Sequence, residues 1–464
     1  MSAVLPVQIR TPFVMLFMQR WGECAMRIIM QIQTNFLLKQ RPSPTQRHSG
    51  EADAYNQPCR WSTCFLCLWL VLQVLLVQPD ISAAYDFESF ARRLGPQDAA
   101  IVADPDGNIL FSHNAHKALI PASTLKILTA LTAFHYLGTA YRFPTEFYMD
   151  AHGNLKIKGY GDPLLISEVV ADISKNLAES LRKGSGHVQD IIIDHTYFEH
   201  PIVIPGVTDS SEPYDAPNGA LCVNFNTVNF KKTKGKYVSA EPQTPLLPMT
   251  LKRIRASGLS QGRIRLSLIN QEIFFYAGNL FKYFLESNGL KISGRVTMGH
   301  VLKGDRLLLT HLSPFTLDQV VMKMMAFSNN YTANQILLHT GAYVFGAPGT
   351  LEKAVETASE YAKNHLKGAD IRMSEGSGIS RENRITAAAM LSVLNEFKPY
   401  HHLLEQEGND VFKTGTLKDI STRAGYIKTN ESALYPYAIL INTPGKSARQ
   451  LGKVLQLILL PADE

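Results

Sequence analysis

The spacing of hydrophobic and polar positions follows two patterns along this chain. The change from one pattern to the other marks the domain organisation. Between 121 and 138, apolar residues recur every three or four positions from a proline to a glycine, which is typical of a helix. The same period returns later, at 317–325, 331–340, 386–397 and 447–460. From about 141 to 311, short apolar runs between Gly, Pro and Asp turns indicate strands instead.

The strand-like segments fall into two groups. Ile101–Phe111 predicts two strands around an Asp-Pro-Asp-Gly turn, and three segments near the C-terminus alternate like an antiparallel meander. The latter are 411–417, 423–429 and 435–442. Within the middle region the candidate strands are 155–158, 191–194, 221–225 and 264–268. The pattern predicts an α+β fold, in which an antiparallel sheet flanked by helices is split by a β-rich inserted region.

This order of elements predicts the domain organisation. Residues 85–144 and 312–464 form one domain, and 145–311 form the inserted domain or domains. Ahead of them, an apolar run at Cys64–Val77 follows Arg60 and precedes Ser82-Ala83-Ala84. This pattern predicts a signal peptide over 59–84, and hence an exported protein of the periplasm or cell envelope. A membrane anchor is the alternative, but the run is shorter than the ~20 residues that a spanning helix needs.

A signal peptide should begin within a few residues of the protein's start, but residues 1–58 precede this one. They show no steady hydrophobic period, and our hypothesis is that they are a non-native or disordered extension, with the true start downstream of Met1. Four of the five cysteines precede the predicted cleavage point, which leaves Cys222 alone. A single thiol forms no internal disulfide, so we expect Cys222 to be buried and structural.

Charge narrows the possible partners. The chain carries 46 Lys and Arg against 40 Asp and Glu, a net +6. Residues 1–84 contribute 7 and 4 of these, so the remainder has 39 against 36, or +3. This excess is too small to indicate nucleic-acid binding. His113 and His116 form an H-x-x-H, but no carboxylate motif accompanies it, and we expect neither a metal nor a cofactor.

Three short motifs follow one another in a meaningful order. Ser123-Thr-Leu-Lys126 opens a predicted helix, Ser328-Asn-Asn330 lies between two helices, and Lys413-Thr-Gly-Thr416 lies on a predicted strand. Each motif alone is common; Ser180-Leu-Arg-Lys183, for example, reads as a solvated helix face. The ordered set is the signature of penicillin-interactive serine acyltransferases.

The chemistry of these residues is consistent with acyl transfer. On a helix, Ser123 and Lys126 share a face, so the amine can take the proton of the nucleophilic hydroxyl. A lysine acts as a base only when its pKa falls, through burial or a nearby cation, for which Lys413 is the candidate. The backbone amides of Ser123 and Thr416 are the expected donors to the oxyanion.

The remaining motif residues suggest substrate contacts. Gly415 lets a ligand lie against the strand, while Lys413, Thr414 and Thr416 offer a cation and two hydroxyls to a carboxylate. Ser328 is a candidate proton relay to the leaving amine, and Asn330 is a candidate partner for a substrate amide. A helix cap is the alternative for the Ser328 segment.

Several longer strings strengthen the identification. They are 159–165 (GYGDPLL), 214–217 (YDAP), 223–228 (VNFNTV), 240–245 (AEPQTP) and 375–384 (EGSGISRENR). With the three motifs, they make residues 85–464 resemble the D-alanyl-D-alanine carboxypeptidase/endopeptidases of the penicillin-binding-protein-4 type. The resemblance implies a β-lactamase/transpeptidase-like domain in two chain segments. Asn329 stands in the middle of the second motif, where related enzymes often have Asp.

The resemblance also implies a function. Ser123 is then the nucleophile, Lys126 the base, Ser328 and Asn330 the second motif and Lys413 to Thr416 the third; Ser377, Gly378 and Arg381 border the pocket. The substrates are peptidoglycan stem peptides or D-alanyl crosslinks, β-lactams are inhibitors, and loose association with the membrane surface or a wall-synthesis complex is expected. Two alternatives stay open: a β-lactamase-like hydrolase, and a catalytically inert wall-binding relative.

Overall fold

The computed structural model describes residues 86–460, except for 185, 367 and 430–432. The predicted signal peptide and the extension before it lie outside the described residues. The central element is a six-stranded sheet in which every neighbouring pair is antiparallel. Across the sheet its strands are β15 (Glu405–Glu407), β16 (Asp410–Leu417), β17 (Ile420–Lys428), β18 (Leu434–Ile441), β1 (Asp98–Ala103) and β2 (Ile109–His113). The first and last thirds of the described chain therefore meet between β18 and β1.

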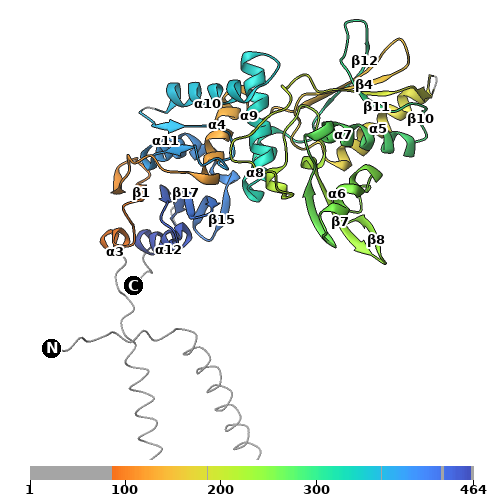
Figure 1. Cartoon of the computed structure of the whole chain (residues 1–464). Coiled ribbons are helices and arrows are strands. Elements are labelled where there is room, and N and C mark those ends of the chain that lie inside the picture. Colours follow the sequence, from red (N-terminus) through yellow and green to blue (C-terminus); the bar gives the residue numbers. More distant parts are fainter. Residues whose placement is uncertain (1–85, 185, 367, 430–432, 461–464) are drawn as a thin grey trace, which may run out of the picture. The chain divides into compact units, whose positions relative to one another are not determined.

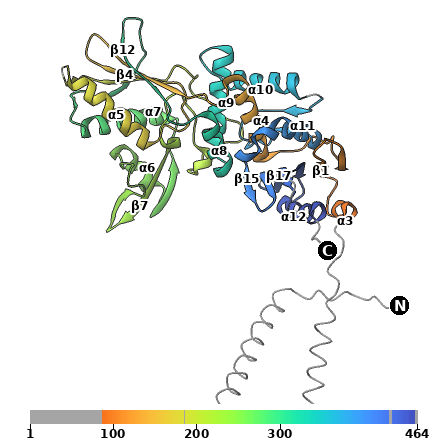
Figure 2. The same cartoon turned by 180° about the vertical axis from the view of Figure 1, so that it is seen from behind.

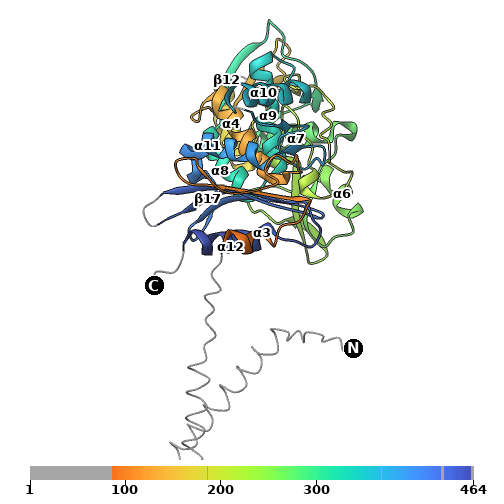
Figure 3. The same cartoon turned by 90° about the vertical axis from the view of Figure 1, so that its left-hand side faces the viewer.

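Helices cover both faces of this sheet, as Figure 3 shows from its edge. One face carries the 3-10 turn η1 (Ala122–Leu125) and the helices α4 (Lys126–Leu137), α8 (Leu317–Phe327), α9 (Asn330–Phe345), α10 (Leu351–His365) and α11 (Ala387–Phe397). The other carries α3 (Phe87–Ala91) and α12 (Ala448–Leu459). Because β1 is buried on both sides, its sequence is a continuous run of small and apolar residues after Asp98 instead of an alternating one.

A second group of elements occupies the region between α4 and α8 (Figure 1). Its five-stranded sheet has the order β11 (Val296–Met298), β6 (Ile191–Asp194), β4 (Leu155–Gly159), β3 (Pro144–Met149) and β12 (Arg306–Leu312). The chain enters through β3 and leaves through β12, and these two strands pair with each other. On this arrangement we propose the domain assignment 145–311 for the insertion, with 85–144 and 312–464 as the other domain.

Shorter elements complete the inserted region, and Figure 2 shows them from behind. A three-stranded sheet has the order β8 (Lys236–Ser239), β7 (Thr227–Thr233) and β9 (Gln261–Arg265), and β5 (His187–Val188) pairs with β10 (Lys291–Ile292). Its helices are α5 (Ser167–Arg182), α6 (Leu251–Ala256) and α7 (Glu272–Ser287). Of α5, the sequence analysis predicted only the end, at Ser180–Lys183, and it did not predict α3, α6, α7 or α10. The fold class is nevertheless confirmed: helices and antiparallel sheets form a mixed α+β architecture.

One predicted strand is wrong. Residues 221–225 form no strand, because Asn224, Phe225 and Asn226 have φ angles of 50°, 57° and 51° in the left-handed region. Asn tolerates this conformation when its side chain finds local partners. Here the Asn224 Oδ1 accepts from the Ser167 backbone N–H at 2.8 Å, and the Asn226 amide donates to the Pro217 carbonyl at 2.8 Å. The apolar run was therefore a buried turn.

Helix α9 joins the two groups of elements. Its residues Ala333, Ile336 and Leu337 belong to the core on the large sheet, whereas Tyr331 belongs to the core of the inserted region. Buried polar contacts reinforce the junction. The Gln335 amide donates to the Gly219 carbonyl at 2.6 Å, and the Asn218 amide donates to Gln335 Oε1 at 2.8 Å.

Cys222 is buried in the inserted region, as expected, and burial raises its thiol pKa to about 12. Its sulfur accepts from the Asn226 amide at 2.8 Å, so the residue is structural. Within the described part of the chain, the helices are all too short or too polar to cross a membrane.

Candidate active site

Ser123 lies in a strained turn between the large sheet and α4. The preceding Ala122 has a φ of 47°, which is unfavourable for a residue with a Cβ and is found where a surrounding structure imposes it. Hydroxyl groups of Thr124 and Thr422 both donate to the Pro121 carbonyl at 2.7 Å and hold this turn on β17. Ser123 itself stays partly exposed, so the turn presents its hydroxyl to a ligand.

Two glycines allow other segments to approach this turn. A Cβ atom on Gly415 would lie 2.7 Å from the Ser123 backbone nitrogen, and one on Gly378 would lie 1.9 Å from the Ala122 carbonyl oxygen. Neither distance is possible for a real side chain, so glycine is required at both positions. Strand β16 and the 375–383 loop thus enclose the nucleophile from two sides.

Lys126 is buried and contacts three polar groups of the site. Its Nζ lies 2.9 Å from Ser123 Oγ, 2.8 Å from Asn330 Oδ1 and 2.7 Å from the Ser377 carbonyl oxygen. A neutral amine has two N–H groups and one lone pair. The two carbonyl oxygens can only accept, so they take both N–H groups and leave the lone pair facing the serine hydroxyl.

Burial and charge favour the neutral amine. Lys126 is fully buried, and this desolvation, with the nearby Lys413 cation, lowers its pKa well below the ordinary value. The Glu375 carboxylate opposes this shift. A buried lysine with a depressed pKa is the form in which lysine acts as a general base.

The second motif is divided between two roles. Ser328 has a φ of 50° at the end of α8 and remains partly exposed, while Asn330 begins α9 and contacts Lys126. Asn329 is the N-cap of α9, because its Oδ1 accepts from the Thr332 backbone N–H at 2.9 Å. The helix cap that the sequence left as an alternative therefore exists within the motif, and Asn329 provides it.

The third motif lies on β16. Lys413 is 2% exposed and donates to the Thr414 carbonyl at 2.9 Å, and burial lowers its pKa to about 8 against the opposing charge of Glu405. Thr414 is partly exposed and Thr416 is exposed, so a ligand can reach both residues. The oxyanion role of the Thr416 amide stays a prediction.

The 375–383 loop supplies the remaining candidates. The Ser377 hydroxyl donates to Glu375 Oε2 at 2.6 Å, and its carbonyl accepts from Lys126. Arg381 is exposed and donates to the Lys418 carbonyl, so it lies at the outer edge of the site, near the end of β16. The role of Ser377, Gly378 and Arg381 as a pocket border stays a prediction.

Sequence reasoning missed Glu375. It lies in the 375–384 segment that resembles the family, but an acidic residue before Gly-Ser-Gly indicates only a turn. The other S-x-x-K is correctly set aside, since Ser180 and Lys183 are exposed at the C-terminal end of α5.

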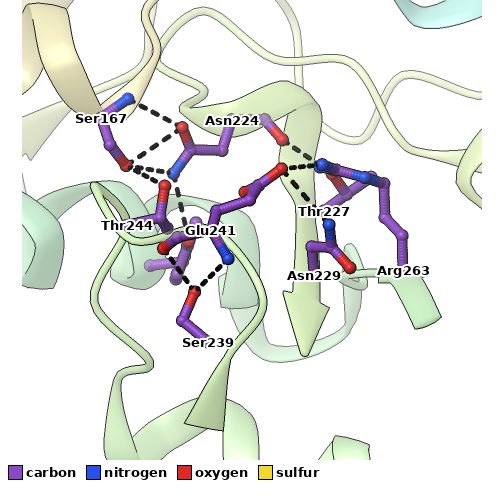
Figure 4. A network of polar contacts seen from close by, with 9 residues as sticks. Ser167, Asn224, Thr227, Asn229, Ser239, Glu241, Thr244 and Arg263 are labelled. Carbon is purple, nitrogen blue, oxygen red and sulfur yellow. Dashed lines mark hydrogen bonds and ion pairs between the residues drawn. The ribbon is translucent and has the colours of Figure 1, made fainter. Parts of the chain in front are cut away.

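A hollow of about 450 Å³ adjoins the second motif, and Asn329 and Thr332 line it while Ser123 does not. One wall is the polar network of Figure 4. There the Asn224 side chain bonds Ser167, and Arg263 bonds both Glu241 and the Thr227 hydroxyl. Ser123 and Lys126 lie outside this hollow.

The chain is similar to known proteins in sequence. The D-Ala-D-Ala carboxypeptidase 3 (S13) family matches residues 92–261 and 260–407, which include the first two motifs and end before Lys413. The D-alanyl-D-alanine carboxypeptidase of Actinomadura sp. (strain R39) is 26% identical over 418 residues, covering 73% of this chain and 77% of that protein. The D-alanyl-D-alanine carboxypeptidase DacB of Haemophilus influenzae is 22% identical over 404 residues, covering 72% and 82%.

Solved structures agree on the fold. The crystal structure of penicillin binding protein 4 (dacB) from Haemophilus influenzae aligns with a TM-score of 0.65 at 19% identity, over 81% of this chain and 98% of that one. A second structure of that protein, complexed with a novel β-lactam, aligns with a TM-score of 0.61 at 18% identity over the same shares.

Proposed function

The chain belongs to the D-Ala-D-Ala carboxypeptidase 3 (S13) family and is a serine-type peptidase of that class, and we propose that it cleaves D-alanyl bonds of peptidoglycan through an acyl-enzyme on Ser123. The observation that carries this proposal is the setting of Lys126. Two carbonyl oxygens bind its amine at 2.8 and 2.7 Å, and Ser123 Oγ lies 2.9 Å away on the remaining side.

The reaction begins when Ser123 Oγ attacks the carbonyl carbon of the D-Ala–D-Ala bond and Lys126 takes the hydroxyl proton. The negative charge on the substrate oxygen faces the backbone N–H of Ser123. Lys126 gives this proton up through the Ser328 hydroxyl to the nitrogen of the leaving D-alanine, the C–N bond breaks, and an ester on Ser123 remains beside a neutral Lys126. Water then attacks this ester by the same route and restores the serine.

The third motif selects the substrate. Lys413 as an ammonium, with the hydroxyls of Thr414 and Thr416, binds the carboxylate that follows the cleaved bond. Penicillins carry a carboxylate in the corresponding place, so we expect them to acylate Ser123 and to inhibit the enzyme. The same pocket accepts a free D-alanine terminus or a D-alanyl crosslink, and Asn330 bonds a substrate amide while it contacts Lys126.

The substrate implies the place of action. Peptidoglycan lies in the cell envelope, and we propose that the apolar run before Ala84 exports the protein there. We further propose that it associates loosely with the membrane surface or with a wall-synthesis complex.

Labelling with a fluorescent penicillin tests the proposal. Residues 85–464 should be labelled stably at one site, the Ser123→Ala variant should take up no label while keeping its circular dichroism spectrum, and Ser180→Ala should be labelled like the wild type. Loss of labelling in Ser180→Ala would mean that the nucleophile was chosen wrongly.

The same experiment separates the alternatives. Transient labelling with rapid loss of free penicillin would identify a β-lactamase-like hydrolase, and no reaction at all would identify an inert relative.

A further inference from the structure

Glu375 is a fully buried carboxylate that the reaction itself does not use. Its two oxygens accept six hydrogen bonds. The donors are the backbone N–H groups of Ser377 (2.7 Å), Gly378 (2.7 Å) and Ser380 (3.3 Å), the Ser377 hydroxyl (2.6 Å), and the side-chain amides of Asn334 (3.0 Å) and Asn383 (2.7 Å). Such complete pairing compensates the cost of burying a charge, and the 375–383 loop is wound around this carboxylate.

The loop is also fixed to two helices. The Thr129 hydroxyl of α4 donates to the Gly376 carbonyl at 2.6 Å, and the Gly376 N–H donates to the Asn334 side chain of α9 at 2.7 Å. Asn334 thus bonds both Glu375 and the residue after it. The Glu375 carboxylate, α4 and α9 together hold the backbone at Gly376.

This fixed backbone reaches the catalytic groups directly. The next carbonyl, of Ser377, accepts from Lys126 at 2.7 Å. The next residue, Gly378, has a φ of 83° and packs against the Ala122 carbonyl, immediately before the nucleophile. The position of the loop therefore decides which way the Lys126 lone pair points.

The charged groups that face Lys126 come from two elements. Lys413 of β16 and Glu375 of the loop act with opposite signs, and Asn330 of α9 and Ser123 are neutral. Burial and the Lys413 cation lower the pKa of Lys126, and the Glu375 charge limits that fall.

On the premise of the proposed function, we propose that Glu375 is a positioning residue of the peptidase: its carboxylate sets the loop that binds one N–H of Lys126, and its charge offsets Lys413. Neither effect requires Glu375 to touch the substrate. A neutral residue of similar size would remove the charge and face the loop's donors with an N–H group.

The test is the rate constant of Ser123 acylation by a fluorescent penicillin, measured from pH 5 to pH 10. The rate of the wild type should rise with pH as Lys126 loses its proton, up to about pH 8, where Lys413 begins to lose its own. In Glu375→Gln the maximal rate should fall at least about tenfold, and the rise should move by about one unit to lower pH, because the amine has lost a negative neighbour. Glu375→Asp keeps the charge and should keep the wild-type position of the rise, with a smaller loss of rate.

Asp194→Asn is the matched control. Asp194 is 2% exposed and accepts from backbone N–H groups of Thr196 and Val301, on a strand of the other sheet. This variant should lose thermal stability but keep both the maximal rate and the pH profile.

If Glu375→Gln does not fold, Asn334→Ala provides the test, since it frees Gly376 and leaves the charge. Its maximal rate should fall severalfold with an unchanged pH profile. Equal rates in the folded variants and the wild type, or an unmoved rise in folded Glu375→Gln, would overturn the inference. Failure of the wild type itself to react at Ser123 would overturn the proposed function instead.

Discussion

Lys126 and Lys413 lie in one buried site, and their different hydrogen-bond partners give them different chemical roles. Lys126 loses both N–H groups to carbonyl oxygens and keeps a lone pair for Ser123, whereas Lys413 bonds a single carbonyl. Each cation disfavours the other, and the more buried one gives up its proton first. Two lysines of equal intrinsic basicity thereby become a base and a cation.

At this residue scale, the pH dependence follows from Lys413. Its pKa is lowered to about 8, so it is an ammonium below that pH and neutral above it. Acylation by a carboxylate-bearing penicillin should therefore decline as pH rises through about 8, approaching tenfold per unit. Stopped-flow or gel-based labelling across this range measures the decline.

A variant that cannot titrate provides the control. In Lys413→Arg the guanidinium stays charged throughout, so the decline near pH 8 should disappear even if the maximal rate is lower. A decline at the same pH in this variant would assign it to another group.

At the scale of elements, α9 carries the second motif and joins the two cores. Asn329 caps its N-terminus and Asn330 contacts Lys126, while later residues belong to the two hydrophobic cores. A change in the cap therefore acts on stability and on the site together.

Asn329→Ala removes the acceptor for the Thr332 N–H and should reduce the free energy of unfolding by about 1 kcal/mol. The acylation rate should also fall, because the cap sets the backbone between Ser328 and Asn330. Urea denaturation and penicillin labelling measure the two effects. Asn329→Asp preserves a capping oxygen and should retain both; equal losses in the two variants would argue that the cap is not the cause.

At the scale of the whole molecule, His339 connects the inserted region to the large sheet's helices. Its Nδ1–H donates to the Tyr160 carbonyl at 2.6 Å, since a carbonyl only accepts, and its Nε2 accepts from the Tyr141 hydroxyl at 2.8 Å. The ring is therefore neutral, and burial lowers its pKa to about 4.

The sign of the stability effect follows. Between about pH 4 and 6.5 the unfolded chain binds a proton on this histidine that the folded chain does not, so stability rises with pH across that window. The loss on acidification is about 3 kcal/mol for the shift of His339. Asp162 acts in the opposite direction, because burial raises its pKa to about 6.

His339→Gln isolates the first contribution. The variant keeps a donor for Tyr160 but cannot titrate, so its stability deficit at pH 7 should shrink or reverse by pH 4.5. Unfolding free energies of both proteins at the two pH values measure this. A deficit that is the same at both would show that His339 is not the acid-sensitive group.

Features of the fold that depend on neighbouring residues could be predicted from the sequence, whereas those that depend on contacts between distant residues could not. Most strands of the large sheet and the helices 317–327 and 387–397 follow from local periodicity, because each pattern is fixed by its own backbone geometry. The strand prediction at 221–225 was wrong because local periodicity does not show side-chain contacts with residues distant in the sequence. Here such contacts of the asparagines accompany a turn at 224–226. Helix α10 was not predicted.

The sequence by itself determined the order of the motifs and the pairing of Ser123 with Lys126, because residues three positions apart on a helix lie on the same face. Only the tertiary structure decided the rest of the site. Asn330 and Ser377 bind the Lys126 amine across 204 and 251 positions, and Glu375 holds the loop that makes the second contact possible. No local spacing encodes such contacts, since they depend on how strands and helices pack, and the lowered pKa of Lys126 depends on that packing as well.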